Sequence, residues 1–252
     1  MKAPTGRSEI TYVTTYYNEP KLLWELLESF DNDTFSKIVI VDDGSKIQPA
    51  EPIVRMFSDL PITLLRIKED LGFNSHGARN LGMKHVDTEW AIITDIDMYF
   101  DAGICNHISQ VTQTAPPNMY FNFWISRKQD FIGRCEMSHN DICIRPSEFW
   151  VSGGYDEEFV GRHWGDRQFM DRVNSYLTRA TIPNILIDRR LARKCIMTDD
   201  VSITTYTDAV LYHPRMPKKE MAKITELVGK RNENRELWVR DSIINYEWEQ
   251  VI

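Results

Sequence analysis

The sequence predicts an α/β protein with a Rossmann-like, mostly parallel central sheet flanked by helices. Strand-like and helix-like segments alternate along roughly the first hundred residues. One expected strand, 38–41, is apolar throughout, as is typical when helices cover both faces of a parallel sheet. Parallel strands need long crossover connections, which are usually helices, so this alternation favours a doubly wound sheet.

The expected elements follow in order along this first part. Strands are short runs rich in β-branched, aromatic and aliphatic residues, and they cover 10–16, 38–41, 62–67 and 90–94. One helix opens at Pro20, which suits a first helical turn, and carries an apolar stripe at helical spacing. A second helix is expected near 51–58, and a third begins after Asn74 or Ser75.

Beyond residue 100 the pattern changes. We expect strands at 119–126, 141–145 and 181–187, a tight turn at Gly153 and Gly154, and a helix over 166–177. From Met216 onward the chain is charged and predicted to be helical. The expected organisation is one domain over 1–215 with a helical C-terminal extension, 216–252, packed on it.

Composition narrows the class of protein. A net charge of -7 argues against a protein that coats nucleic acid or an acidic membrane. The four cysteines have no C-x-x-C spacing, which indicates neither a zinc site nor a disulfide framework. No apolar run reaches the roughly 18 residues of a membrane span, and the N-terminus lacks the apolar stretch of a signal peptide. We therefore expect a cytoplasmic protein without a transmembrane segment.

Two of the expected strands end in acidic residues. Asp42 and Asp43 follow 38–41, and Asp95 and Asp97 follow 90–94. The carboxyl ends of parallel strands are where such sheets bind ligands. If the strand continued past residue 94, Asp95 and Asp97 would point the same way. Such paired charges are costly without a cation, so the sequence indicates a metal and a nucleotide diphosphate here.

Five short motifs occur together in this chain. They are Thr14-Thr15-Tyr16-Tyr17-Asn18-Glu19, Val41-Asp42-Asp43-Gly44-Ser45, Gly77-Ala78-Arg79-Asn80-Leu81-Gly82, Asp95-Ile96-Asp97, and Gly153-Gly154-Tyr155 followed by Trp164-Gly165-Asp166. In this order and spacing they resemble the inverting family-two glycosyltransferases with the GT-A fold. The resemblance covers roughly residues 8 to 215.

The resemblance implies a set of residues that bind the nucleotide-sugar: Thr15, Tyr16, Tyr17, Glu19, Asp42, Asp43, Arg79, Asp95 and Ile96. A carboxylate from Asp42 or Asp43 would accept the uracil N3–H, which favours a UDP-sugar and leaves a GDP-sugar possible. A tyrosine would stack on the base. The alternatives are a helix cap for Asp43, core positions for the tyrosines, a first-turn acid for Glu19 and a surface ion pair for Arg79.

For the metal, Mn²⁺ or Mg²⁺, we expect Asp97 as a direct ligand, with Asp95 on the ribose or on a metal-bound water. The resemblance places a metal-binding histidine near His213, and His139 and His163 are weaker candidates. An imidazole ligand would favour Mn²⁺.

On the acceptor side, the resemblance implies that Asp166 is the catalytic base and that Gly154 and Trp164 contact the acceptor. Gly165 stands where the family usually has glutamate. Asp166 could instead cap the following helix, and Trp164 could be a core residue. Gly77 and Gly82 are expected where their helix closely approaches a ligand or strand, and the basic run 189–194 as a solvated face or an anion site.

Together these features predict a metal-dependent enzyme that transfers one hexosyl or N-acetylhexosaminyl group to a hydroxyl. The acceptor class stays open among glycans, lipid-linked sugars, proteins and nucleic acids. Two other functions are compatible with the sequence. One is a sugar-phosphate nucleotidyltransferase, although the loop after the first strand lacks the Gly-rich, basic character of those enzymes. The other is a non-catalytic binding module, for which Gly165 is the best support.

Overall fold

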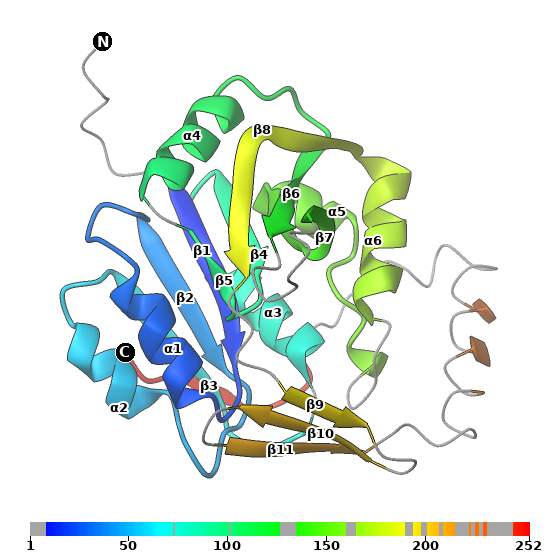
Figure 1. Ribbon diagram of the computed structural model, residues 1–252. Helices are drawn as coiled ribbons and strands as arrows, with labels where there is room; N and C mark the ends of the chain where they lie inside the picture. The colour runs from blue at the N-terminus through cyan, green and yellow to red at the C-terminus, as the bar shows by residue number, and fades with distance from the viewer. Residues whose placement is uncertain are drawn as a thin grey trace.

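The computed structural model describes residues 9–72, 74–100, 102–126, 135–159, 165–189, 194–197, 201–206, 209–214, 222, 225–226, 229–230 and 244–252. Its centre is a nine-stranded sheet in the order β12-β3-β2-β1-β4-β7-β6-β8-β5 (Figure 1). The α/β architecture that the sequence predicts is confirmed.

The first four strands form the parallel half of the sheet. They are β1 (Ile10–Tyr16), β2 (Lys37–Asp42), β3 (Ile62–Ile67) and β4 (Trp90–Thr94). Strand β1 pairs in parallel with both β2 and β4, and β2 pairs with β3. Tyr16 is in register with Asp42, and Thr14 with Thr94. The carboxyl ends of β1, β2 and β4 therefore meet at one edge of the sheet.

The other half of the sheet is mixed rather than mostly parallel. Its strands are β5 (Met98–Tyr99), β6 (Met119–Ser126), β7 (Cys135–Ile144) and β8 (Thr178–Arg189). Strand β7 runs antiparallel to both β4 and β6, whereas β6 and β8 are parallel. The expected strand at 141–145 is thus the end of a longer one. This reversal at β7 sets an antiparallel strand beside the acidic end of β4.

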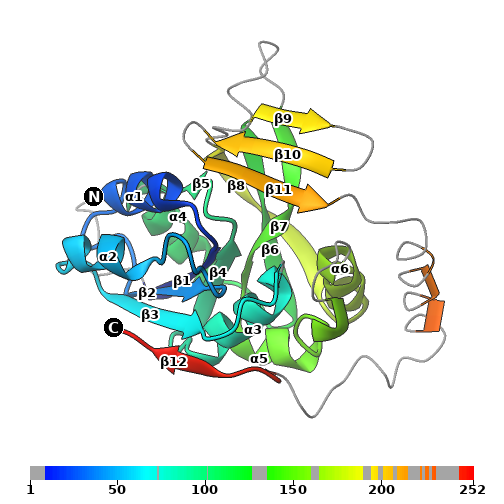
Figure 2. The ribbon, with the colours of Figure 1, turned by 90° about the horizontal axis from the view of Figure 1, so that it is seen from below.

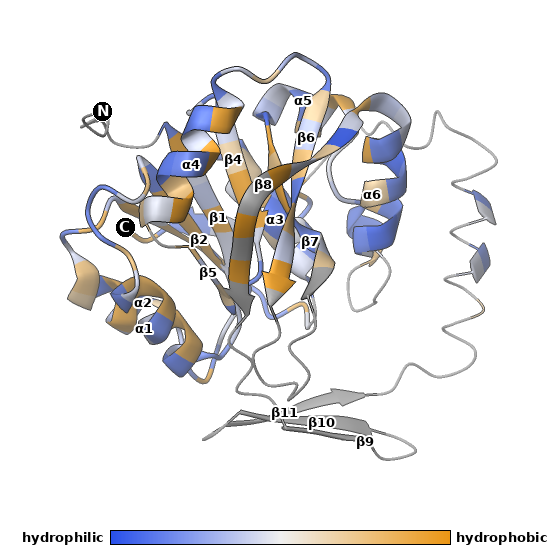
Figure 3. Cartoon of the chain, turned by 45° about the horizontal axis from the view of Figure 1, so that its top comes forward, coloured by the Kyte–Doolittle hydropathy of each residue, from blue (hydrophilic) through white to orange (hydrophobic). Residues whose placement is uncertain are grey.

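Helices cover both faces of the sheet (Figure 2). On one face lie α1 (Pro20–Glu28), α2 (Glu51–Val54) with the 3-10 turn η1 (Arg55–Phe57), and α4 (Ala102–Thr112). On the other lie α3 (Ser75–Lys84), α5 (Pro146–Val151) and α6 (Gly165–Tyr176), with the turn η2 (Glu157–Phe159) between the last two. Apolar residues line the strands and the inward sides of the helices (Figure 3).

Alternation along the strands divides the core between these two faces. Tyr12 packs with the α1 side, whereas its neighbour Val13 packs with the α3 side. Gly82 brings α3 close to the sheet, because a Cβ at this position would lie 2.5 Å from Val13 Cγ1. The prediction that Gly82 marks a close helix–strand approach is confirmed. A Cβ on Gly77 would lie 2.6 Å from Asn74 Oδ1 and 2.9 Å from Tyr246 Cε1, so at Gly77 the close neighbours are the residue before α3 and the C-terminal segment.

The end of the chain is extended, which corrects the prediction of a wholly helical extension. Strand β12 (Trp248–Gln250) pairs antiparallel with β3, and Val251 N donates to Leu64 O at 2.8 Å. The physical reason is that β3 would otherwise leave its backbone groups unpaired at the sheet edge. In the rest of the predicted extension, 216–243, the structure describes only residues 222, 225–226 and 229–230, all helical.

A separate three-stranded antiparallel sheet follows β8. It contains β9 (Lys194–Met197), β10 (Val201–Tyr206) and β11 (Ala209–Pro214), none of which was expected from the sequence pattern. The basic run 189–194 spans the end of β8 and the start of β9, and its side chains lie outside the described residues. Across the described ranges, the structure has no helix that is long and apolar enough to cross a bilayer.

Candidate active site

Both carboxylate oxygens of Asp42 accept hydrogen bonds from the loop that follows β2. Its side chain is fully buried, with Oδ1 accepting a hydrogen bond from Ser45 N and Oδ2 from Ala50 N, both at 2.9 Å. Gly44 completes this turn with φ +75, and a Cβ there would lie 2.5 Å from Glu69 O. Burial raises the pKa of Asp42, although the two N–H groups oppose that shift. Asp42 therefore holds the loop and the start of α2.

Asp43 is the acid at this strand end that keeps an oxygen available. Its Oδ2 accepts a hydrogen bond from Asn74 N at 3.0 Å, whereas Oδ1 accepts none within the described residues. The side chain is 4% exposed. Burial, with smaller contributions from the Asp42 and Asp70 charges, raises the pKa of Asp43 to about 7. The capping alternative considered for Asp43 does not apply to α2, whose N-cap is Ala50 and which has no side-chain capping hydrogen bond.

The two tyrosines after β1 have different surroundings. Tyr16 is buried, and its hydroxyl donates to Gln48 O at 2.5 Å, so the core alternative holds for Tyr16. Tyr17 is partly exposed, and its hydroxyl donates to Asp70 Oδ2 at 3.2 Å. Thr15 is also partly exposed. Tyr17 and Thr15 therefore have surface with which to meet a ligand.

Asn18 and Glu19 shape the loop between β1 and α1. Asn18 has a φ of 49, its N–H donates to Ser45 Oγ at 3.0 Å, and its Oδ1 accepts from Gln48 N at 2.9 Å. It joins the loops after β1 and β2, a role that its place in the motif did not reveal. Glu19 is buried, and its carbonyl accepts Leu23 N at 3.0 Å as α1 begins.

At the end of β4, the acids do not share one direction. The strand stops at Thr94, and Met98 N donates to Asp95 O at 3.2 Å across a turn. The Asp95 side chain is 29% exposed, whereas Asp97 is 1% exposed. Ile96 packs its side chain into the core beside α1, so only its backbone could meet a nucleotide. The turn thus breaks the alternation that a continuing strand would have given.

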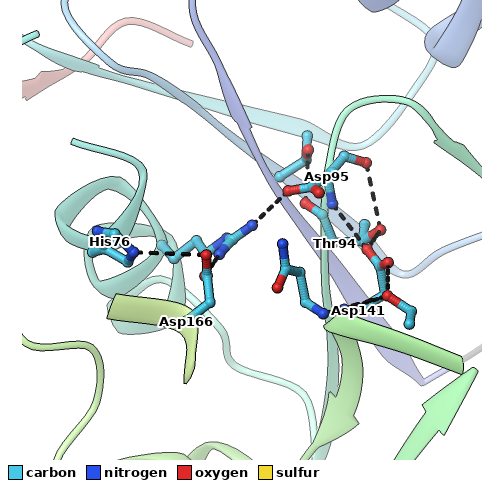
Figure 4. A network of polar contacts seen from close by, with 9 residues as sticks. His76, Thr94, Asp95, Asp141 and Asp166 are labelled. Atoms are coloured by element: carbon cyan, nitrogen blue, oxygen red, sulfur yellow. Dashed lines mark hydrogen bonds and ion pairs between the residues drawn. The ribbon is translucent and has the colours of Figure 1, made fainter. Parts of the chain in front are cut away.

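Arg79 joins the two acidic motifs through Asp95 and Asp166, which Figure 4 labels. Its Nη2 lies 2.5 Å from Asp95 Oδ1, and its Nη1 forms a short ion pair with Asp166 Oδ1. Its side chain is 2% exposed, and the guanidinium lies over the Tyr155 ring, 5.3 Å from its centroid. The surface ion pair considered for Arg79 is therefore wrong, because this arginine is buried among the acids of the site.

Asp166 is the second residue of α6 and lies inside the helix rather than capping it. Its carboxylate is 25% exposed, with Oδ1 on Arg79 and Oδ2 lying 3.8 Å from His76 Nε2. Burial alone would raise the pKa of Asp166, but the Arg79 and His76 side chains outweigh it and hold that pKa below its ordinary value. Asp166 is thus an ionised carboxylate that is partly open to solvent.

Asp141 is a buried acid that lies outside the sequence motifs of the site. It lies on β7, and its Oδ1 accepts hydrogen bonds from Thr94 Oγ1 at 2.5 Å and from Asp95 N at 3.1 Å. Burial, and then the Asp95 charge, raise the pKa of Asp141 to about 7. The sequence carries no signal for this contact, because it depends on the antiparallel pairing of β7 with β4. Asp141 fixes the turn that presents Asp95.

The predicted acceptor residues are only partly described. Gly154 has φ +62, and a Cβ there would lie 2.9 Å from Asn80 Oδ1. The Asn80 side chain also binds both backbone groups of Tyr155: its Nδ2 donates to Tyr155 O and its Oδ1 accepts from Tyr155 N, both at 2.8 Å. Gly154 is therefore required by the turn itself. Trp164 and His163 lie outside the described residues, as do the side chains of His139 on β7 and His213 on β11.

The acids after β4 fit a divalent cation by their donor chemistry. Carboxylate oxygens suit Mn²⁺ and Mg²⁺, and such ions are often held by one or two carboxylates together with substrate phosphates. Asp95 is partly exposed, whereas Asp97 is buried. Among the described side chains, no three of the His, Cys, Asp and Glu type converge on one point. A cation here would take its other ligands from a diphosphate, from water or from undescribed residues.

Acids gather at the carboxyl ends of the parallel strands, and the antiparallel strand β7 pairs beside them. This is the arrangement of the GT-A fold. Solved structures of S. aureus TarS share it. TarS 1–349 in complex with UDP-GlcNAc has a TM-score of 0.64 at 14% identity, covering 89% of this chain and 66% of that one. Another TarS 1–349 structure has a TM-score of 0.58 at 15% identity, with 89% and 65% covered.

Sequence comparison agrees with the fold. Residues 11–130 match the family model Glycosyl transferase family 2. The uncharacterized glycosyltransferase YwdF of Bacillus subtilis (strain 168) is 28% identical over 109 residues, which are 42% of this chain and 39% of that protein. The chain thus spans less than half of this curated relative and about two thirds of the TarS fragment. The chain has the GT-A fold, and residues 11–130 are similar to glycosyl transferase family 2, which agrees with the resemblance of its motifs.

Proposed function

We propose that this protein transfers a single sugar from a nucleotide-diphosphate sugar to a hydroxyl acceptor, with inversion at the anomeric carbon. One observation carries the proposal: Arg79 holds Asp95 of the D-x-D motif and Asp166 of the acceptor-side motif on one guanidinium. Two motifs that lie far apart in the sequence thereby form one site. A donor diphosphate and an acceptor hydroxyl would be presented to each other there.

UDP is the favoured nucleotide. Asp43 Oδ1 is a buried acceptor without a hydrogen bond among the described residues, and the uracil N3–H is a donor that would satisfy it. Guanine has a comparable ring N–H, so a GDP-sugar is the second choice. Tyr17 and Thr15, partly exposed beside Asp43, would flank the base and ribose. The TarS structure with UDP-GlcNAc supports a hexosyl or N-acetylhexosaminyl donor.

Asp95, Asp97 and, from β11, His213 would hold Mn²⁺ or Mg²⁺ against the diphosphate. When bound, the ion would offset the negative charge that grows on the leaving diphosphate. Arg79 is close enough to Asp95 to share this task through its fixed fork of N–H donors.

Asp166 would be the base. In a single displacement, the acceptor oxygen bonds to the anomeric carbon, the bond from that carbon to the diphosphate oxygen breaks, and the hydroxyl proton passes to the Asp166 carboxylate. The carboxylate is ionised and a quarter exposed, so an acceptor can reach it. The non-catalytic alternative loses its best support, because Gly165 has a structural explanation in the space that the His76 ring occupies.

A donor panel tests this function. UDP, GDP, their sugar conjugates and nucleoside triphosphates are each added with and without Mn²⁺, and thermal stability and donor hydrolysis are measured. We expect one UDP-sugar to raise Tm and to be slowly hydrolysed only with Mn²⁺. Release of pyrophosphate from a triphosphate, without sugar hydrolysis, would indicate a nucleotidyltransferase instead.

Two variants assign the roles within that assay. Asp166→Asn should keep nucleotide-sugar binding and reduce turnover by about 10³-fold or more, because the base is lost and the shape is kept. Asp97→Ala should remove the Mn²⁺-dependent part of binding. If Asp166→Asn turned over at the wild-type rate, the proposed base would be wrong.

A further inference from the structure

His76 is a buried histidine that faces the proposed base. It is the second residue of α3 and precedes Arg79 by about one helical turn, so both side chains point to the same side of the helix. Arg79 contacts Asp166 Oδ1, and His76 Nε2 lies 3.8 Å from Asp166 Oδ2. Figure 4 shows the imidazole directed at this second oxygen. The two carboxylate oxygens therefore face two different groups of α3.

Gly165 makes room for this imidazole. A Cβ on Gly165 would lie 2.6 Å from His76 Cδ2 and 2.7 Å from Cε1, closer than real Cβ atoms approach other atoms. The ring is fully buried, so it cannot swing into solvent to relieve the clash. Any side chain at position 165 would have to displace the histidine. His76 and Gly165 are therefore a matched pair on two helices.

The aromatic residues behind the imidazole restrict its position further. The His76 and Tyr155 ring centroids are 5.8 Å apart, and Tyr155 stacks on Phe169 of α6 at 4.1 Å. Phe169 is on the same helix as Asp166. This packing fixes the ring relative to the helix that carries the carboxylate.

We propose that His76 is a positioning residue for Asp166, and that position 165 is glycine in order to admit it. The inference rests on the proposed function and deepens it. Arg79 is shared with Asp95 and faces the site of the diphosphate, so it cannot be the sole support of the base during the reaction. His76 faces the other carboxylate oxygen, Oδ2, and keeps the carboxylate oriented while Asp166 takes up the acceptor proton.

The test compares His76→Ala and His76→Gln with wild type. His85→Ala is the matched control, since His85 lies at the far end of α3 against Trp248. We expect His76→Ala to lower kcat by about 10–100-fold with the donor KM unchanged, because a misplaced base costs rate rather than binding. His76→Gln, which retains an N–H of similar reach, should recover part of kcat. Unchanged kcat in both variants would overturn the proposal.

The acid side of the pH profile separates positioning from mere folding. Arg79, His76, Asp95 and Tyr155 are the charged or titratable groups that act on Asp166 or share its surroundings. Without His76, the pKa of Asp166 should rise, so the acid limb of log kcat against pH should move upward. Carboxyl NMR of Asp166 reads the same pKa without any turnover. An Asp166 pKa equal in wild type and His76→Ala would contradict the inference even if the proposed activity were absent.

A double-mutant cycle tests the matched pair directly. Gly165→Ala alone should lower kcat by as much as His76→Ala, since it displaces the ring. In the His76→Ala background, Gly165→Ala should cost less than about two-fold, because nothing remains to be displaced. Additive effects would show that position 165 acts independently of His76. Absence of sugar transfer by wild-type protein would instead count against the proposed function.

Discussion

The ends of β2 and β4 each carry two acids, yet the fold satisfies them by different means. At β2, backbone N–H groups of Ser45 and Ala50 occupy both oxygens of Asp42. At β4, a buried guanidinium serves Asp95 and also reaches Asp166. At β2, two neutral backbone dipoles therefore compensate the carboxylate of Asp42. At β4, the charge of Asp95 is compensated by one buried cation, Arg79, which is shared with Asp166.

This difference indicates which acid is available for a ligand. At β2 Asp43, which follows Asp42, keeps a buried oxygen without a hydrogen bond among the described residues. At β4 the exposed acid, Asp95, shares its cation with the proposed base. A nucleotide would therefore complete a hydrogen bond at β2, whereas a diphosphate and its cation would rearrange charges at β4.

Arg79→Ala should show the largest effect. Its loss leaves the Asp95 and Asp166 carboxylates without their cation, and removing one partner of a buried ion pair costs several kcal/mol. Because both acids are a quarter or more exposed, we expect a loss of about 2–4 kcal/mol in the free energy of unfolding. Urea unfolding at pH 7 measures it. Arg66→Ala, which removes more exposed ion pairs on β3, is the control and should cost about 1 kcal/mol or less.

Asp42→Asn should be the next most damaging change. The amide can accept only through one atom, so one of the two backbone N–H groups at Ser45 and Ala50 loses its acceptor inside the protein. We expect a loss of about 1–3 kcal/mol in the free energy of unfolding. An unchanged urea midpoint would show that the loop after β2 does not depend on this carboxylate.

Asp43→Asn should change stability in the opposite direction at high pH. The pKa of Asp43 is about 7, above its ordinary value of about 3.9, so the folded state binds a proton that the unfolded state releases. Wild-type stability should therefore fall as pH rises from about 4 to about 7 and level off above that.

The variant removes this dependence and should be about 1–2 kcal/mol more stable than wild type at pH 8. UDP binding by wild type should weaken as pH falls below 7, since the ionised carboxylate is the better acceptor for N3–H. Urea titrations and UDP calorimetry at several pH values measure both effects. A stability difference that is the same at pH 5 and pH 8 would contradict the buried charge.

The smallest expected effects on stability concern the two tyrosines at the end of β1. Tyr16→Phe removes a buried hydroxyl that donates to Gln48 O, and should cost about 1 kcal/mol. Tyr17→Phe removes a partly exposed hydroxyl and should change stability by less than about 0.5 kcal/mol. Tyr17→Ala should weaken nucleotide binding, whereas Tyr16→Phe should not. An equal binding loss for Tyr16→Phe would mean that the hydrogen bond from the Tyr16 hydroxyl to Gln48 O also supports the nucleotide site.

Much of the fold could be predicted from the sequence because it depends on local pattern. The apolar runs that became β1 to β4, the stripe of α1, and the glycines of α3 each express a short-range rule of burial, periodicity or close approach. The C-terminal strand β12 was not readable, because its partner β3 lies far away in the sequence and edge pairing uses backbone atoms. The small sheet β9 to β11 was missed as well.

The sequence by itself determined which residue types gather at the carboxyl edge of the sheet: the acids after β2 and β4, Arg79 and Asp166. Only the tertiary structure decided which of them remain available. The Asp42 carboxylate is hydrogen-bonded within its loop, whereas Asp43 keeps one oxygen without a hydrogen bond among the described residues. Asp97 is buried, whereas Asp95 is partly exposed. At position 165, the His76 ring occupies the space that a side chain would need. The reason is that composition and periodicity determine the position of a residue on its strand or helix. Burial and hydrogen-bond partners, which come from distant segments, fix what it can still do.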